Sequence, residues 1–517
     1  MKRTPGRHWW ILGAMVFALF MVMLDMTVVT VALPSIQSSL NASEQNLEWT
    51  VNAFSLALAS LTLLGGKLGD RFGRRRLFLV GLALFTVSSA ACALSQTDTQ
   101  LVAGRAAQGV GGALMGPLSL SIIVAAFPKD RLPTALGIWA GASAVGLAVG
   151  PLVGGFLVDA AGWSSVFWIN VPIGIAGALV TWWVVPESRD PTTEALDLPG
   201  TALATAGLFA FVWGLIETSS HDWTSIDVIS RLVVGSLLLA AFIVREATTS
   251  APMLPLGFFR NLRFSTANAV MLALGFALFG VIYFLTLFMQ NVQGYSAVQT
   301  GIRSLPLTLM VVIGAPFAGR FSGRFGARPF VVVGMVLCAV SIVGLSRLVP
   351  ASPYSDMWPW LVVFGLGSAL TMPVLAATAM ATADRAKAGV ASGMLNTSRQ
   401  VGTALGVAVL GSIGATVARA DWSSWTNGLP ASLQPGAQSL EPLVVIGRGG
   451  QIESLASQTV GQAGGALAAT QAVDAFTHGM GQAFLVGAGI ALVAGALAAV
   501  GLAGHPRPEP GEPALTP

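Results

Sequence analysis

Two charged residues lie deep inside long apolar segments, and the chemistry open to them can be stated from the sequence. Asp25 is the only carboxylate well inside any apolar segment of the chain, and Arg105 lies in a second such segment. Both would lie about 8–11 Å below the same surface of a membrane, so they could meet across a cavity. A buried charge that is neither paired nor hydrated is costly, which marks such residues as functional. A change in the burial or pairing of Asp25 would make it bind or release a proton; the alternative is a structural role at a helix interruption.

A second group of charged residues lies in a short polar turn between two apolar segments. The sequence GKLGDRFGRR contains Asp70, Arg71 and Arg74 together with Gly66 and Gly73. Glycine adopts backbone conformations that other residues disfavour, so a tight turn is predicted here. The arginines would also hold this turn on the cytoplasmic side of a membrane.

A third candidate, Arg399, lies near the middle of an apolar segment with no acidic residue at its depth. We expect it to face a hydrated cavity beside Asn396 and Gln400 and to contact an anion or a substrate. Further candidates for the lining of a cavity are Trp49, Asn52, Phe54, Gln108 and Trp139. Aromatic residues in membrane helices also pack or anchor at the interface, so that alternative remains open for three of them.

The composition indicates a membrane protein. Of 517 residues, 54% are hydrophobic and only 10% are charged, and the mean hydropathy is +0.73, whereas soluble domains carry about 25% charged residues. The two cysteines and four histidines show no metal-ligand spacing, and neither a phosphate-binding loop nor a nucleophile elbow is present. We therefore expect no enzyme activity, no metal site and no cofactor. The net charge of +4 is distributed by loop, so no nucleic acid is expected as a partner.

The apolar segments predict fourteen membrane-spanning helices, since a span needs roughly 20 apolar residues. The predicted spans are 9–32, 48–67, 77–95, 100–127, 134–158, 164–186, 198–216, 228–245, 264–289, 298–318, 329–349, 357–381, 389–417 and 478–503. With both termini in the cytoplasm, twenty of the 27 basic residues lie on that side and four on the other, as the positive-inside rule requires. The first apolar segment is interpreted as a retained helix rather than a signal peptide. Residues 418–477 are predicted to form an external loop, partly helical.

An internal repeat divides the chain. The sequence QGVGGALMGP at 108–117 matches FGLGSALTMP at 364–373, and GKLGDRFGRR at 66–75 matches GRFSGRFGAR at 319–328. The repeat predicts a six-helix bundle in residues 1–190, two inserted helices in 191–260 and a second six-helix bundle in 261–517. Two such repeats around a central cavity permit alternating access.

Five motifs in order resemble the major facilitator superfamily, specifically its fourteen-spanner drug:proton antiporter family. They are LDMTVVTVALPSI (24–36), GGKLGDRFGRRR (65–76), LVAGRAAQGVGG (101–112), GIWAGASAVGLAVGPLVGG (137–155) and WINVPIG (168–174). The resemblance implies that Asp70 latches a gate against a helix that begins near Ala388. The second copy has Gly323 where the aspartate would be, which argues against a second latch.

The fourth motif is associated with antiporters, and the resemblance implies a hinge and a seal against leakage. Its small residues and its proline are Gly141, Gly146, Gly150, Pro151, Gly154 and Gly155. Small residues allow helices to approach closely and proline removes a backbone hydrogen bond, so packing alone is an alternative interpretation.

The resemblance thus implies a proton-driven antiporter that exports hydrophobic or amphipathic drugs or antibiotics across a bacterial inner membrane. A lipophilic small molecule, protons and the lipid bilayer are its expected partners, and a monomer is expected. Two alternatives remain: export of an endogenous metabolite or lipid, and a solute:proton symporter on the same fold.

Overall fold

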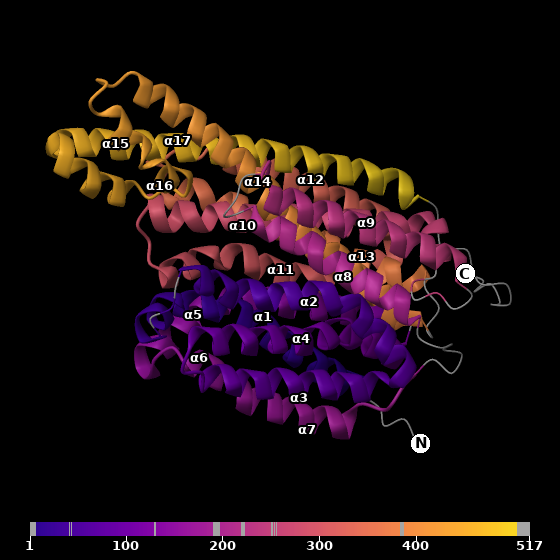
Figure 1. The fold of residues 1–517 in the computed structure, drawn as a ribbon. Coiled ribbons are helices and arrows are strands. Elements are labelled where there is room, and N and C mark those ends of the chain that lie inside the picture. The colour runs from indigo at the N-terminus through magenta and orange to yellow at the C-terminus, as the bar shows by residue number, and fades with distance from the viewer. Residues whose placement is uncertain are drawn as a thin grey trace.

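The computed structural model describes residues 7–40, 42, 44–128, 131–189, 197–218, 223–249, 252, 254, 256–382 and 387–503. Within these ranges the regular structure is entirely helical, without a β-strand. The long helices run side by side along one direction (Figure 1). These observations confirm the all-helical fold class.

The helices follow the apolar segments of the sequence. The long ones are α1 (Arg7–Leu40), α2 (Glu44–Phe72), α3 (Arg74–Ala93), α4 (Asp98–Ala126), α5 (Leu132–Ala161), α7 (Asn170–Val184), α8 (Leu198–Glu217), α9 (Ile226–Thr248), α10 (Leu262–Leu287), α11 (Ala297–Phe325), α12 (Ala327–Leu345), α13 (Tyr354–Thr382), α14 (Ala388–Asn427) and α17 (Gly449–Gly501). Short helices are α6 (Ser165–Trp168), η1 (Leu256–Arg260), η2 (Phe288–Val292), α15 (Gln434–Gln438) and α16 (Glu441–Val445).

Thirteen helices in the described part of the chain are long and apolar enough to cross a membrane. The remaining predicted span corresponds to α5, a continuous helix of 30 residues. Its described apolar parts, Leu132–Ala142 and Leu152–Ala161, are each shorter than a span. The count of fourteen spans and the side on which each end lies therefore stay predictions.

The two halves of the chain repeat one packing pattern. In the first half α2 packs on α4, α1 on α5, and α3 on both α4 and α7. The second half repeats these pairs as α11 on α13, α10 on α14, and α12 on both α13 and α17. The halves meet through two matching interfaces, α2 with α14 and α5 with α11, and they form separate layers in Figure 1.

The repeated glycines explain this internal symmetry. A Cβ atom at Gly109 of α4 would overlap the carbonyl oxygen of Phe54, and one at Gly365 of α13 would overlap that of Leu307. Two residues further along, the same relation holds between Gly111 and Gly81 and between Gly367 and Gly334. Because only glycine allows these backbones to touch, both halves keep it at the same helix crossings.

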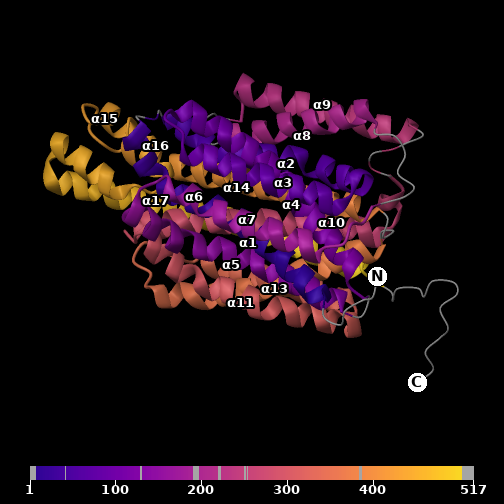
Figure 2. The ribbon, with the colours of Figure 1, turned by 90° about the horizontal axis from the view of Figure 1, so that it is seen from below.

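The two inserted helices lie at the periphery. α8 packs on α9, on α2 and on α14, and α9 lies outermost (Figure 2). Besides this packing, Arg245 joins α9 to the start of α8, since its guanidinium donates two hydrogen bonds to Asp197. This ion pair lowers the pKa of the Asp197 carboxyl. The predicted boundaries at residues 190 and 260 stay predictions, and residue 190 itself lies outside the described ranges.

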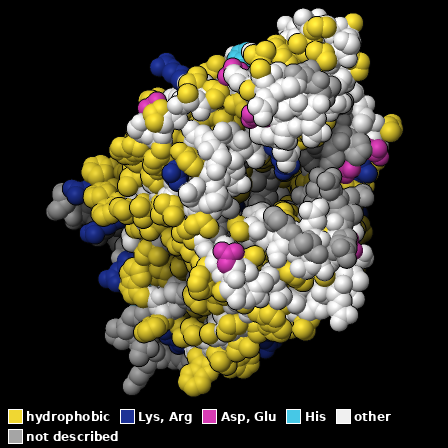
Figure 3. All heavy atoms as spheres, turned by 90° about the vertical axis from the view of Figure 1, so that its left-hand side faces the viewer, with side chains coloured by type: hydrophobic (Ala, Val, Ile, Leu, Met, Phe, Trp, Pro, Cys, Tyr) yellow, Lys and Arg dark blue, Asp and Glu magenta, His cyan; other side chains and the backbone are white. Residues whose placement is uncertain are grey.

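The segment 418–477, predicted to be partly helical, is mostly helical, and its place outside the membrane stays a prediction. α14 continues to Asn427, α15 and α16 follow, and α17 begins at Gly449 with a break at Gly461, where φ is 77°. The segment has an apolar core of its own that includes Trp422, Val444 and Ile452. It projects beyond the bundle (Figure 1), and Figure 3 looks onto this end of the molecule, whose surface is hollowed near the middle.

Candidate functional site

Asp25 lies in a hydrogen-bonded network inside the first half of the molecule. Its side chain is fully buried, and Arg105 Nη1 lies 2.5 Å from Oδ2. Gln108 Nε2 and Asn170 Nδ2 donate to Oδ1 at 2.9 and 2.8 Å. The carboxylate of α1 is therefore held by donors from α4 and α7, and its buried charge is both paired with a cation and hydrogen-bonded.

Arg105 joins further helices to this network. Its Nε donates to the carbonyl of Thr50 in α2 at 3.0 Å, and its Nη1 also donates to Gln108 Oε1 at 2.7 Å. The ring of Phe54 lies 4.3 Å from the guanidinium carbon, a cation–π contact. The predicted proximity of Asp25 and Arg105 is thus present, but they meet within one half and not across a cavity between halves.

Asn170 belongs to this network and was missed by the sequence reasoning. Besides contacting Asp25, its amide donates to Ser89 Oγ of α3 at 3.1 Å. Asn170 lies in the motif WINVPIG, and a polar amide within this apolar segment was the one feature that could have marked it as a functional residue. A buried amide needs hydrogen-bond partners. Residue spacing alone, however, could not show that the Asn170 side chain points from α7 toward Asp25.

The Asp70 carboxylate joins the two halves at the end of α2. It is buried, and it accepts hydrogen bonds from the backbone N–H groups of Gly389 and Val390, both at 3.0 Å. Arg74 completes the contact, with its Nη2 2.7 Å from Asp70 Oδ1. A carboxylate at the N-terminus of α14 is also favoured by the helix dipole. The contact is the one implied for a latch, and its role in gating stays a prediction.

Gly66 makes this contact possible. A Cβ atom at Gly66 would overlap the carbonyl oxygen of Gly389, and one at Gly389 would overlap both Gly66 and the Asp70 carboxylate. Gly66 therefore allows α2 and α14 to cross in backbone contact, one turn before Asp70.

The equivalent crossing in the other interface lacks the latch. A Cβ atom added at Gly319 of α11 would overlap the carbonyl oxygen of Pro133 in α5, just as one added at Gly66 would overlap that of Gly389. Pro133 has no N–H group to donate, and Gly323 has no carboxylate to accept. Among the described residues of this crossing, the acceptor and one of the two donors are thus missing, while Thr134 keeps the N–H group equivalent to that of Val390.

The rest of the turn anchors the start of α3. Gly73 has φ 109°, a conformation that favours glycine, and Gly326 at the equivalent place in the repeat has φ 83°. Glu187, which sequence reasoning did not single out, accepts hydrogen bonds from the N–H groups of Arg75 and Arg76 and so caps α3. The guanidinium of Arg71 lies over the ring of Phe72.

The glycines of α5 form two packing faces. Gly146, Gly150 and Gly154 lie against α1, where added Cβ atoms would meet Met23, Thr27 and Val28. Gly141 and Gly155 face Val312 and Val298 of α11 in the other half. The backbone of α5 is helical throughout, and the Pro151 side chain lies outside the described residues. Close packing is therefore present, and the hinge stays a prediction.

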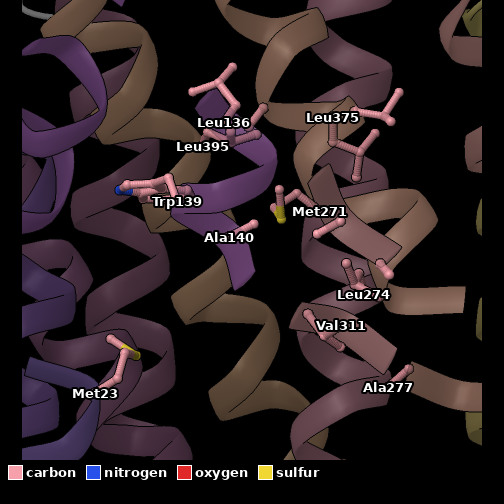
Figure 4. Close-up of a cluster of buried hydrophobic side chains, with 14 of the residues drawn as sticks. Met23, Leu136, Trp139, Ala140, Met271, Leu274, Ala277, Val311, Leu375 and Leu395 are labelled. Atoms are coloured by element: carbon pink, nitrogen blue, oxygen red, sulfur yellow. The ribbon is translucent and has the colours of Figure 1, made fainter. Parts of the chain in front are cut away.

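Two cavities lie between the halves. The first, about 430 Å³, is lined by α2, α8 and α14 and reaches Arg419 and Ile446 near the projecting segment. The second, about 450 Å³, is lined chiefly by α1, α10, α11 and α13. Both touch Tyr283. Beside the second cavity, a buried cluster that includes Leu136, Trp139 and Leu395 packs the two halves together (Figure 4).

The cavity candidates divide into two groups. Asn52 lines the first cavity and Arg399 the second. The others are not among the residues that line either cavity: Phe54 and Gln108 contact Arg105, Trp49 meets Trp213 edge to face, Trp139 donates to Ser119, and Asn396 donates to the Ser392 carbonyl. Gln400 lines the first cavity and Arg399 the second, so these neighbours face different spaces.

The family model described as Major Facilitator Superfamily matches residues 15–407. The chain belongs to the major facilitator superfamily. A major facilitator protein of this kind is a transporter and not an enzyme, and its multi-pass membrane character follows from the family and the apolar helices.

Several relatives are resistance and export proteins. The "Tetracenomycin C resistance and export protein" of Streptomyces glaucescens is 37% identical over 95% of this chain and 91% of its own length. The "Cephamycin export protein" of Amycolatopsis lactamdurans is 38% identical over 80% and 85% of the two chains. The "Methylenomycin A resistance protein" of Bacillus subtilis is 34% identical over 78% and 87%. These relatives identify the chain as a member of the drug-efflux family of the superfamily.

Solved major facilitator structures share the fold. The human organic anion transporter MFSD10 aligns with a TM-score of 0.62 at 15% identity, over 96% of this chain and 100% of that one. A bacterial homolog of the human lysosomal transporter Spinster aligns with a TM-score of 0.58 at 18% identity, over 96% and 98% of the two chains. At this identity the likeness concerns the fold alone.

Proposed function

We propose that this transporter is a proton-coupled antiporter that exports hydrophobic or amphipathic drugs or antibiotics across a bacterial inner membrane by alternating access. The observation that carries the proposal is the buried Asp25 network. In this network a carboxylate of α1 is held by donors from α4 and α7. The next residue, Met26, lines the first cavity.

Protonation of Asp25 would weaken the contacts that join α1 to α4 and α7. A neutral carboxyl loses the ionic part of its bond to Arg105, and one of its oxygens becomes a donor facing other donors. Because Met23, Met26 and Thr27 of α1 line the cavities, a shift of α1 would change the cavity walls. Proton uptake at Asp25 and release of substrate would thereby be linked.

The latch supplies the second part of the cycle. With Asp70 bound to the start of α14, the halves are held together at one end of the bundle. Opening this end requires that Asp70 leave the two N–H groups, so the contact favours one access state over the other. The proton gradient is the only energy source proposed, without a cofactor, and the monomer in the bilayer is the proposed working unit.

The test measures export driven by an imposed pH gradient. Inside-out vesicles from a pump-deficient host would carry the wild type, Asp25→Asn or Asp159→Asn, the last an exposed carboxylate of α5. We expect uptake of a lipophilic fluorescent substrate that an uncoupler abolishes, loss of this uptake in Asp25→Asn, and wild-type uptake in Asp159→Asn. Uncoupler-resistant uptake, or wild-type uptake in Asp25→Asn, would contradict proton coupling through this residue. A growth-inhibition panel of chemically diverse toxic compounds in the same host, with and without the protein, would define the substrates.

A further inference from the structure

Arg399 differs from the two buried arginines of the described ranges and from the arginine that lines the first cavity. Arg105 is paired with Asp25, Arg74 with Asp70, and Arg419 in the wall of the first cavity with Glu441 at 3.0 Å. No described residue accepts a hydrogen bond from the Arg399 guanidinium, and its Nε is fully buried. An arginine has five N–H donors and keeps its charge in proteins, so this site has a donor group without an acceptor.

The position of Arg399 is fixed by its helix. Its backbone carbonyl would touch a Cβ atom at Gly275 of α10, and the α14–α10 contact continues through Gly402 and Gly406. Arg399 lies eleven residues after the first residue of α14, about 17 Å along the helix. The side chain is therefore held near the middle of the bundle, where it lines the second cavity.

The second cavity has the size and character of a small-molecule site. Its volume of about 450 Å³ lies within the range of about 300–1,000 Å³ for ligand pockets. Leu274, Leu278 and Val311 give it apolar walls, whereas Thr300 contributes a buried hydroxyl without a partner. Arg399 is the one charged residue among those that line it, and no carboxylate is among them.

We propose that Arg399 binds the acidic group of the exported molecule, so that the substrates include amphipathic compounds with an apolar ring system and a single carboxylate or similar anion. This rests on the proposed export function and names its substrate class. A guanidinium matches a carboxylate in a bidentate geometry, and the apolar walls would bury the ring system. The bound anion would neutralise a charge that is otherwise costly inside the membrane.

The test compares two probes with the same ring system, of which one is an anion and the other is its neutral methyl ester. Anthracene-9-carboxylate and its methyl ester would be titrated by fluorescence into the full-length protein in nanodiscs, with empty nanodiscs subtracted. We expect the wild type to bind the acid at least about tenfold more tightly than the ester, as for a hydrogen-bonded charge. Arg399→Gln should remove this preference, Arg399→Lys should keep part of it, and Arg419→Gln should leave it unchanged.

The ester is the control for misfolding, because a variant Arg399→Gln that still binds the ester has an intact cavity. A wild type without preference for the acid, or an Arg399→Gln variant that retains it, would overturn the proposal. Displacement of the acid by chloride as effective as by unlabelled acid would assign Arg399 to inorganic anions and would also overturn it. The binding ratio needs no proton gradient, so it remains informative if the vesicle assay disproves proton-coupled export.

Discussion

At the scale of single residues, Asp25 and Arg105 depend on each other for burial. Arg105 supplies the only cationic partner of Asp25 among the described residues, while Gln108 and Asn170 contribute neutral donors. Removal of one member of a buried ion pair leaves an uncompensated charge, which costs about 3–5 kcal/mol.

We therefore predict that Arg105→Ala destabilises the protein more than Asp25→Asn does. Each variant leaves one charge without its counter-ion, but in Asp25→Asn the guanidinium of Arg105 keeps an acceptor oxygen at position 25, the Thr50 carbonyl and Gln108 Oε1. The alanine variant leaves the Asp25 carboxylate with neutral donors alone. Thermal unfolding of the purified protein, followed by intrinsic fluorescence, would show the larger drop in midpoint for Arg105→Ala. Combining Arg105→Met with Asp25→Asn should recover part of the stability but not the transport. A double variant as unstable as Arg105→Ala alone would show that the unpaired charge is not the cause.

At the scale of helices, the crossing of α2 and α14 combines a close backbone contact with an ion pair. Gly66 provides the contact and Asp70 the bond to the start of α14. The two features make separate predictions, because one concerns shape and the other charge.

Gly66→Ala should impair transport by separating the two helices. The added methyl group would overlap the Gly389 carbonyl, a backbone atom that cannot rotate away. The matched control is Gly116→Ala in α4, where no atom lies within 4 Å of the added Cβ. Uptake into inside-out vesicles, corrected for protein amount, would be reduced in the first variant and unchanged in the second. Equal uptake in both would show that the helices do not need this contact.

Asp70→Asn should slow turnover while leaving substrate affinity near that of the wild type. The amide offers one acceptor oxygen where the carboxylate serves Gly389, Val390 and Arg74 with two, and Asp70 does not line either cavity. Initial uptake rates and equilibrium binding of the same fluorescent substrate would separate the effects. A binding defect as large as the rate defect would place Asp70 in substrate binding instead.

At the scale of the whole molecule, the halves carry the same helix crossings, but within the described residues a buried carboxylate joins the helices at one of the two interfaces alone. The second interface has Gly323 and Pro133 where the first has Asp70 and Gly389. The projecting segment adds a further asymmetry, since it is built only from the second half, by the end of α14, α15, α16 and the start of α17 (Figure 1).

The topology makes a prediction for the two ends of the bundle. Single cysteines at Ser439, between α15 and α16, and at Ala327, the first residue of α12, should be labelled from opposite sides of the membrane. The native Cys92 and Cys338 are buried and would first be replaced by alanine. An impermeant maleimide should label only position 439 in intact cells, and position 327 after permeabilisation. Labelling of both positions in intact cells would contradict the fourteen-span arrangement.

The sequence by itself determined the helical class and the internal repeat, and it was sufficient to predict that Asp25 lies near Arg105 and that Asp70 contacts the start of a distant helix. Hydropathy and basic-residue counts depend only on local composition, and equal depth in two helices was enough to relate Asp25 to Arg105. The turn after Asp70 could also be predicted from the sequence, since its glycines and arginines lie within ten residues of each other.

Only the tertiary structure decided which side chains meet. Asn170 reaches Asp25 because α7 packs on α1 and α3, and Trp139 turns into the core while its neighbour Ala140 lines a cavity. The direction of a side chain around an apolar helix depends on how distant helices pack, and a helix that is apolar all round carries little periodic signal. The core of the segment 418–477 also depends on distant contacts. Trp422 and Ile452 are 30 residues apart, and they pack into one core only because the chain turns back between them.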